Sequence, residues 1–156
     1  MITESDEQIA RLRPVLGERL HCRPGCADCC RPFSVFALEA AMIAGQEIRP
    51  AASPAAADVC VFLENGLCRI YRFRPLLCRG QGLPLAYIDD SAEAEHPCLE
   101  ISACLMNFPE DTEFAMEELL FLDETNRRLA ALNIQYCRQA RLEAGRRVPL
   151  AAIFSP

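Results

Sequence analysis

Four cysteines lie in the run HCRPGCADCC at positions 21–30, and two of them, Cys29 and Cys30, are adjacent. The chain of 156 residues contains ten cysteines in all, far more than ordinary usage. No other feature constrains the fold as strongly, because clustered thiols either pair as disulfides or bind metals and redox groups. Whether the protein's compartment is oxidising or reducing decides between disulfides and metal or redox chemistry.

The N-terminal residues argue against export. The segment MITESDEQIARLRPVLG begins acidic and has neither an apolar signal-peptide core nor a small-residue cleavage site. No stretch approaches the roughly 18 apolar residues that a membrane span needs. We therefore expect a cytoplasmic protein with no membrane partner, in which thiols stay reduced and clustered cysteines are metal ligands or redox groups.

The formal net charge is −6, and all sixteen basic residues are arginine. Between Arg79 and Arg127 there is no arginine or lysine, while aspartate and glutamate accumulate. Such an acidic stretch repels phosphates and disfavours nucleic acid as a partner. Six arginines lie near cysteines in the sequence, where cations and N–H donors could stabilise thiolates, although solubility alone would also explain them. They are Arg23, Arg31, Arg69, Arg72, Arg74 and Arg79.

The length and a hydrophobic content of 51% fit one ordinary domain, so we expect residues 1-156 to form a single domain. Ser5 begins a capping-box pattern that predicts an opening helix, and Pro14 should kink or split this helix. A second helix is predicted to start after Ser34 as its N-cap and to end at Gly45.

Beyond a motif core at residues 22–108, helices are predicted over 109–145, the last of them around 134–144. LAYI (85–88) and LEIS (99–102) predict two short strands around an acidic loop. The fold class that we expect is mainly α with a small β-hairpin element, an α+β domain organised around a cysteine metal cluster.

The segment CVFLENGLCRIY (60–71) predicts a β-hairpin, because Asn-Gly lies between two apolar runs. A two-residue loop would pair Leu63 with Cys68 and put Cys60 on the opposite face of the strand. A three-residue loop would pair Phe62 with Cys68, so that Cys60 becomes a diagonal neighbour of Cys68 at roughly 7–8 Å. If both cysteines bind the same ion, we expect the three-residue turn.

The spacing of Cys26 and Cys29 is typical of a single metal-binding loop, and Cys22 can join them from one turn earlier. Cys30 is harder to place, because adjacent side chains tend to diverge. It either completes a four-thiolate site through a tight bend or faces a second metal. The spacing matches neither a bacterial ferredoxin nor a zinc finger, so it indicates a metal without identifying it.

Two segments together resemble the cysteine-cluster family called YkgJ or CxxCxxCC, whose name implies a zinc- or iron-chelating domain. They are HCRPGCADCC (21–30) and CVFLENGLCRIYRFRPLLCRG (60–80), with further similarity in GLPLAY (82–87) and CLMNF (104–108). The resemblance implies eight thiolate ligands, with Cys98 as the alternative to the last. These ligands are Cys22, Cys26, Cys29, Cys30, Cys60, Cys68, Cys78 and Cys104.

The resemblance does not supply a reaction. A related cysteine cluster occurs in flagellin lysine methylases, which implies iron–sulfur chemistry in some relatives, but this chain has no glycine-rich loop for S-adenosylmethionine. Three functions remain open: a structural metal site that presents a surface to a protein partner, a redox or catalytic iron–sulfur protein, and a metal delivery or storage protein. Whether the chain is an enzyme stays open.

Several other residues are candidates for ligands or for groups that tune the ligands. We expect His21 and His96 to be surface or hydrogen-bonding residues, Cys137 to be a buried structural thiol, and Glu39 to be exposed on a helix. Tyr71 could donate to a thiolate or could be a core residue of the hairpin.

Our prediction for the cofactor is zinc or iron, with zinc slightly ahead, bound as one or two ions or as an iron–sulfur cluster. Eight thiolates could make two four-sulfur sites. Cys29 and Cys30 would then be the junction, with one thiol directed to each site.

Overall fold

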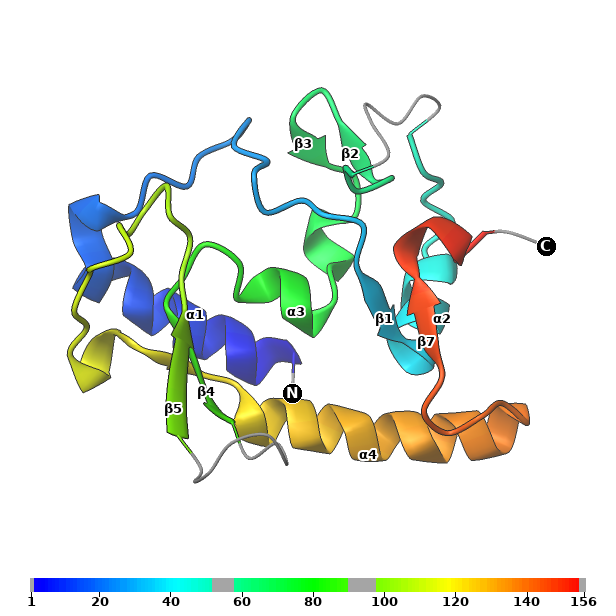
Figure 1. Cartoon of the computed structure of the whole chain (residues 1–156). Helices are drawn as coiled ribbons and strands as arrows, with labels where there is room; N and C mark the ends of the chain where they lie inside the picture. The colour runs from blue at the N-terminus through cyan, green and yellow to red at the C-terminus, as the bar shows by residue number, and fades with distance from the viewer. Residues whose placement is uncertain (1, 52–57, 90–97, 155–156) are drawn as a thin grey trace. The chain divides into compact units, whose positions relative to one another are not determined.

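The computed structural model describes residues 2–51, 58–89 and 98–154 (Figure 1). Its helices and small sheets confirm the α+β class. The residue contacts divide the chain into two compact units, which we call unit 1 and unit 2. Unit 1 consists of Met1–Cys22 and Arg79–Arg128, and unit 2 of Arg23–Cys78 and Leu129–Pro156.

Unit 1 opens with helix α1 (Ile2–Leu16), followed by a 3-10 turn at Gly17–Arg19. The helix already begins at Ile2 and Ser5 is buried inside it, so the predicted N-cap at Ser5 is wrong. The helix also continues through Pro14 and is not split there. Proline has no N–H and therefore removes one hydrogen bond of the helix. Because Pro14 lies in the last turn, this loss affects only the end of the helix.

Unit 1 also contains a three-stranded sheet, with strand order β5-β4-β6. Strands β4 (Leu85–Asp89) and β5 (Cys98–Ser102) are antiparallel, and β6 (Leu120–Phe121) is parallel to β4. The predicted strands at 85–88 and 99–102 are therefore confirmed, and the acidic loop between them lies outside the described residues.

Helix α4 (Asp123–Ala140) is a single helix, and it starts later than predicted. The prediction of helices over 109–145 is wrong for residues 109–122, which hold a 3-10 turn at Met116–Glu118 and strand β6. The backbone N–H of Leu120 donates to the carbonyl of Pro84 at 2.9 Å, so pairing with the sheet overrides the helical pattern there.

In unit 2, strand β1 (Ser34–Phe36) pairs antiparallel with β7 (Arg147–Pro149) and leads directly into helix α2 (Ala37–Ala44). Ser34 is therefore not the N-cap of a helix, and that prediction is wrong. The predicted end of α2 at Gly45 is confirmed.

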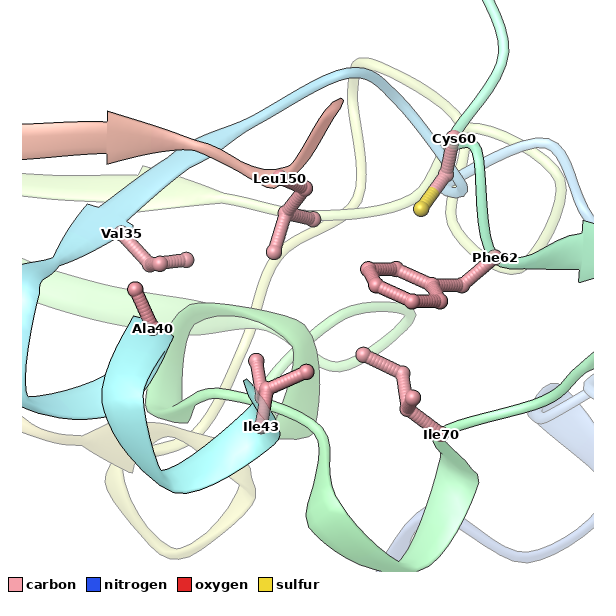
Figure 2. Close-up of a cluster of buried hydrophobic side chains, with 7 residues drawn as sticks. All are labelled: Val35, Ala40, Ile43, Cys60, Phe62, Ile70 and Leu150. Atoms are coloured by element: carbon pink, nitrogen blue, oxygen red, sulfur yellow. The ribbon is translucent and has the colours of Figure 1, made fainter. Parts of the chain in front are cut away.

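Two short strands, β2 (Leu63–Glu64) and β3 (Leu67–Cys68), form the predicted hairpin, followed by a 3-10 turn at Tyr71–Phe73 and helix α3 (Leu76–Arg79). Near the C-terminus a 3-10 turn covers Leu150–Ala152. The core of unit 2 joins these elements, and Figure 2 shows its side chains directed toward one another. The core residues are Val35, Ala40, Ile43, Cys60, Phe62, Ile70 and Leu150.

Among the helices that the structure describes, none is both long and apolar enough to cross a membrane. All ten cysteines lie within the described ranges, and all are free thiols.

Candidate metal centre

Five cysteines of unit 2 gather from four separate segments. The charges of Cys29, Cys60 and Cys68 oppose ionisation of the Cys30 thiol, which requires these sulfurs to be neighbours. The charges of Cys60 and Cys68 likewise oppose ionisation of Cys78, which α3 carries. We call this group the five-thiol cluster: Cys29, Cys30, Cys60, Cys68 and Cys78.

A tight bend brings Cys29 and Cys30 together. The N–H of Cys30 donates to the carbonyl of Ala27 at 2.8 Å, and the N–H of Arg31 donates to the carbonyl of Cys29 at 3.0 Å. This second bond closes a three-residue turn around Cys30. Each of the two thiols shifts the pKa of the other, so the two sulfurs lie close together. Their direction to two separate metal sites stays a prediction.

The hairpin has the two-residue turn. Leu63 pairs with Cys68, and both Asn65 (φ 52°) and Gly66 (φ 75°) lie in the left-handed region, as a type I′ turn requires. Of the two loops considered, the structure therefore has the two-residue one and not the three-residue one.

Cys60 still reaches the cluster, because it lies outside the strand and the alternation of strand faces does not apply to it. The N–H of Leu63 donates back to the carbonyl of Cys60 at 3.0 Å in a turn that precedes β2. The N–H of Cys60 donates to the carbonyl of Cys30 at 3.0 Å, which fixes these two segments side by side.

Burial and mutual hydrogen bonding set the acidity of the five thiols. Burial raises the pKa of Cys78 to about 12, and burial is also the main cause that raises the pKa of Cys60 and Cys68. The hydrogen bond from Cys30 lowers the pKa of Cys29 to about 6, and the same bond raises the pKa of Cys30. Without metal, the cluster at neutral pH therefore holds Cys29 as thiolate and the others as thiols.

Arg74 is the cation that faces this cluster. The positive charge of Arg74 lowers the pKa of Cys29, Cys68 and Cys78, but it is not the largest influence on the pKa of any of them. The guanidinium carbon of Arg74 lies over the Tyr71 ring, 4.1 Å from its centroid, in a cation–π contact. Tyr71 itself is exposed, so its interpretation as a core residue of the hairpin is wrong.

Other arginines of the predicted set make ion pairs. Arg79 is buried in unit 1 and donates to both carboxylate oxygens of Asp6 at 2.7 Å. In unit 2, Arg69 pairs with Glu64 at 2.7 Å. Arg79 and Arg69 therefore contribute ion pairs to the fold, in addition to any effect on thiolates.

Glu39 is buried, so the expectation of an exposed helix glutamate is wrong. One carboxylate oxygen accepts the N–H of Phe36 at 3.1 Å and the other accepts the N–H of Leu76 at 2.8 Å. The carboxylate therefore binds the N-termini of α2 and α3 at once. It also lies close enough to Cys78 for its charge to raise the pKa of that thiol slightly.

In unit 1, Cys22 and Cys104 both contact Asn107, a residue whose role the sequence did not reveal. The side-chain Nδ2 of Asn107 donates to Cys22 Sγ at 3.3 Å. The backbone N–H of Asn107 donates to the carbonyl of Cys104 at 2.9 Å. One buried asparagine therefore hydrogen-bonds to the sulfur of Cys22 and to the backbone of Cys104.

The remaining candidates differ in their exposure. Cys26 and Cys98 are exposed, and Cys137 is buried in α4 with its sulfur 3.7 Å from Asn133 Oδ1, as expected for a structural thiol. His21 is exposed and donates its backbone N–H to Asn107 Oδ1 at 3.0 Å. His96 lies outside the described residues.

The cluster offers sulfur ligands, which are the ligands that a thiophilic metal prefers. Thiolate sulfur is the ligand that zinc and iron–sulfur centres share, and each commonly uses four. Within residues 2–51, 58–89 and 98–154, no three His, Cys, Asp or Glu side chains already surround one point as a metal would require. The five sulfurs are thus neighbours that still have to close around an ion.

A model of the CxxCxxCC family, described as "Putative zinc- or iron-chelating domain", matches residues 21–99. The matched range is about half of the chain and includes all five thiols of the cluster as well as Cys22 and Cys26. Cys104 and Asn107 lie beyond it. No curated protein and no solved structure matches the chain.

Proposed function

The chain belongs to the CxxCxxCC family, and from this premise we propose that it chelates zinc or iron through cysteine thiolates to hold its own fold together. The observation that carries the proposal is the convergence of the five-thiol cluster. Its members come from the loop before β1, the turn before β2, strand β3 and helix α3. One ion bound by four of these sulfurs would cross-link all four segments.

A structural role follows from how little else joins these segments. The hairpin strands have two residues each and α3 has four, lengths that are marginal without support. Metal binding would therefore contribute directly to the free energy of folding. We favour zinc over iron, because a closed set of four thiolates is typical of structural zinc sites.

Cys22, Cys26 and Cys104 complete the proposed set of eight ligands. Cys22 and Cys104 share Asn107 in unit 1, which supports treating them as a pair. Eight thiolate ligands in all would suffice for two four-sulfur sites, so that the protein would bind two equivalents. Free thiols at all ten positions agree with a reducing compartment, and we propose the cytoplasm.

A metal delivery function is the second candidate, favoured by one observation. The cluster holds five sulfurs where a tetrahedral ion takes four, and Cys26 offers a further exposed thiol in the same unit. A spare sulfur beside a full site would allow stepwise ligand exchange with a partner protein.

Anaerobic purification followed by elemental analysis and an absorption spectrum tests the proposal. A colourless protein with tightly held zinc that unfolds on chelation supports the structural role. Visible absorption with acid-labile sulfide would replace it with an iron–sulfur centre, and metal that exchanges readily while the empty protein stays folded would favour delivery.

Serine substitutions locate the site. Cys60→Ser, Cys68→Ser and Cys78→Ser should each lose one equivalent of metal. Cys137→Ser is the matched control for Cys60→Ser in particular, because it also replaces a buried thiol with a hydroxyl but removes no proposed ligand. Equal metal content in all four variants would contradict the assignment.

A further inference from the structure

Asn107 presents a buried hydrogen-bond donor to the sulfur of Cys22. Its side-chain Nδ2 lies 3.3 Å from Cys22 Sγ and 2.7 Å from the carbonyl oxygen of Gly82. Its Oδ1 accepts the backbone N–H of His21 at 3.0 Å. Only 8% of Asn107 is exposed, so water competes little for these bonds.

The partners of this amide fix which end faces the sulfur. A carbonyl oxygen can only accept and a backbone N–H can only donate, so Nδ2 must face Gly82 and Oδ1 must face His21. One hydrogen of the NH₂ group is used by Gly82, and the other points to Cys22. The sulfur is therefore the acceptor, and a thiolate accepts more strongly than a thiol.

Because Gly82 has no side chain, there is room beside it for the sulfur of Cys22. A Cβ atom at this position would lie 2.7 Å from Cys22 Sγ, closer than any real contact. Gly82 also has a φ of +90°, which side chains rarely adopt. The sulfur is thus confined between a glycine backbone and an amide donor.

The donor is itself anchored to another candidate ligand. The carbonyl of Cys104 accepts the N–H groups of Asn107 at 2.9 Å and of Phe108 at 2.8 Å, which forms a tight turn. Phe108 is buried and packs edge-to-face against Phe114 with 5.1 Å between ring centroids. The turn that carries Cys104 therefore also fixes the donor to Cys22.

We infer that Asn107 is a positioning residue, which holds the Cys22 thiolate in the orientation in which it binds the metal. The inference rests on the proposed function, in which Cys22 is a ligand. An N–H donor to a ligating sulfur orients it and stabilises its charge, and loss of such partners typically weakens metal affinity about 10- to 100-fold.

A double-mutant comparison tests this role. Zinc affinity, by chelator competition, and the sulfur-to-cobalt absorption of the Co²⁺-substituted protein are measured for wild type, Asn107→Asp, Cys22→Ser and the double variant. Asn107→Asp keeps an oxygen for His21 but replaces the donor. We expect it to weaken zinc binding about 10- to 100-fold and to lose the same absorption as Cys22→Ser, with no further loss in the double variant.

The outcomes separate the inference from the proposed function. Wild-type affinity in Cys22→Ser would show that Cys22 is not a ligand, which would overturn the inference and reduce the proposed ligand set, but would leave the five-thiol site in place. Weakened binding in Cys22→Ser beside wild-type binding in Asn107→Asp would overturn the inference alone. Additive losses in the double variant would also overturn it, because Asn107 would then act elsewhere than through Cys22.

Two further measurements cover the case in which Asn107→Asp does not fold. Gly82→Ala should reproduce its zinc affinity, while Gly145→Ala, where a Cβ meets no atom within 4 Å, should bind as wild type. In the metal-free protein, Gly82→Ala should also change the rate at which iodoacetamide labels Cys22 several-fold and leave the rate at Cys98 unchanged, although both cysteines are exposed. An unchanged rate at Cys22 would contradict a held sulfur.

Discussion

The carboxylate of Glu39 accepts the backbone N–H of Leu76 at 2.8 Å, which joins helix α2 to the first residue of the helix that carries Cys78. The other oxygen of the same carboxylate accepts the N–H of Phe36. Both oxygens act only as acceptors, and both N–H groups would otherwise lack an intrahelical partner. Glu39 therefore fixes the start of helix α3, and with it the position of Cys78, in the metal-free protein.

Replacing Glu39 with glutamine should destabilise the protein. An amide offers one acceptor oxygen, so one of the two N–H groups would face an NH₂ donor instead. We expect a loss of about 1–3 kcal/mol in the free energy of unfolding of the metal-free protein, measured by urea titration. Glu117→Gln, at an exposed position, is the matched control and should change stability by about 0.5 kcal/mol or less. A loss no larger than that of the control would contradict the role of Glu39.

The metal-free cluster should react with alkylating agents at one thiol first. At pH 7 a pKa of about 6 leaves Cys29 mostly ionised, whereas a pKa of about 12 keeps Cys78 protonated. Since the thiolate is the nucleophile, iodoacetamide should label Cys29 before Cys78, and the rate should fall as the pH drops below about 6. Peptide mass spectrometry of timed samples measures this order. Simultaneous labelling of both thiols would contradict it, and bound metal should protect both.

The sequence predicted which segments lie close together better than how they approach each other. Cysteine spacing identified the segments that meet, and the strands around residues 85–88 and 99–102 followed from local pattern. The bend at Cys29 and Cys30 could not be predicted, because it depends partly on the N–H of Cys60 binding the carbonyl of Cys30. No local rule places two adjacent thiols against each other.

The supporting polar residues were missed for a related reason. Glu39 is 37 positions from Leu76, and Asn107 is 85 positions from Cys22. A glutamate or an asparagine with no nearby pattern carries no signal that its partner lies so far along the chain. Only the folded backbone makes these two side chains the acceptor and the donor that the site requires.

Metal affinity should fall as the medium becomes more acidic. Burial raises the pKa of Cys60, Cys68 and Cys78, so zinc must displace a proton from each of these thiols at neutral pH. Each displaced proton makes the affinity fall about tenfold per pH unit. Chelator competition between pH 6 and 8 measures the slope, and calorimetry in two buffers counts the protons released. An affinity independent of pH would mean that these thiols are not ligands.

Gly66 should contribute to metal binding although it supplies no ligand. A Cβ atom there would lie 3.2 Å from the Cα of Gly25, in the loop that leads to Cys29, and the φ of Gly66 is 75°. Gly66→Ala would strain the turn and push this loop away from the hairpin, so Cys29 and Cys30 would separate from Cys68. We expect zinc affinity to fall about tenfold, because the ligands must then be brought together at the expense of binding energy. Leu67→Ala, at the exposed neighbouring position, keeps the turn and should bind zinc as wild type. If the two variants bind zinc equally well, the contact between the hairpin and the loop does not organise the site.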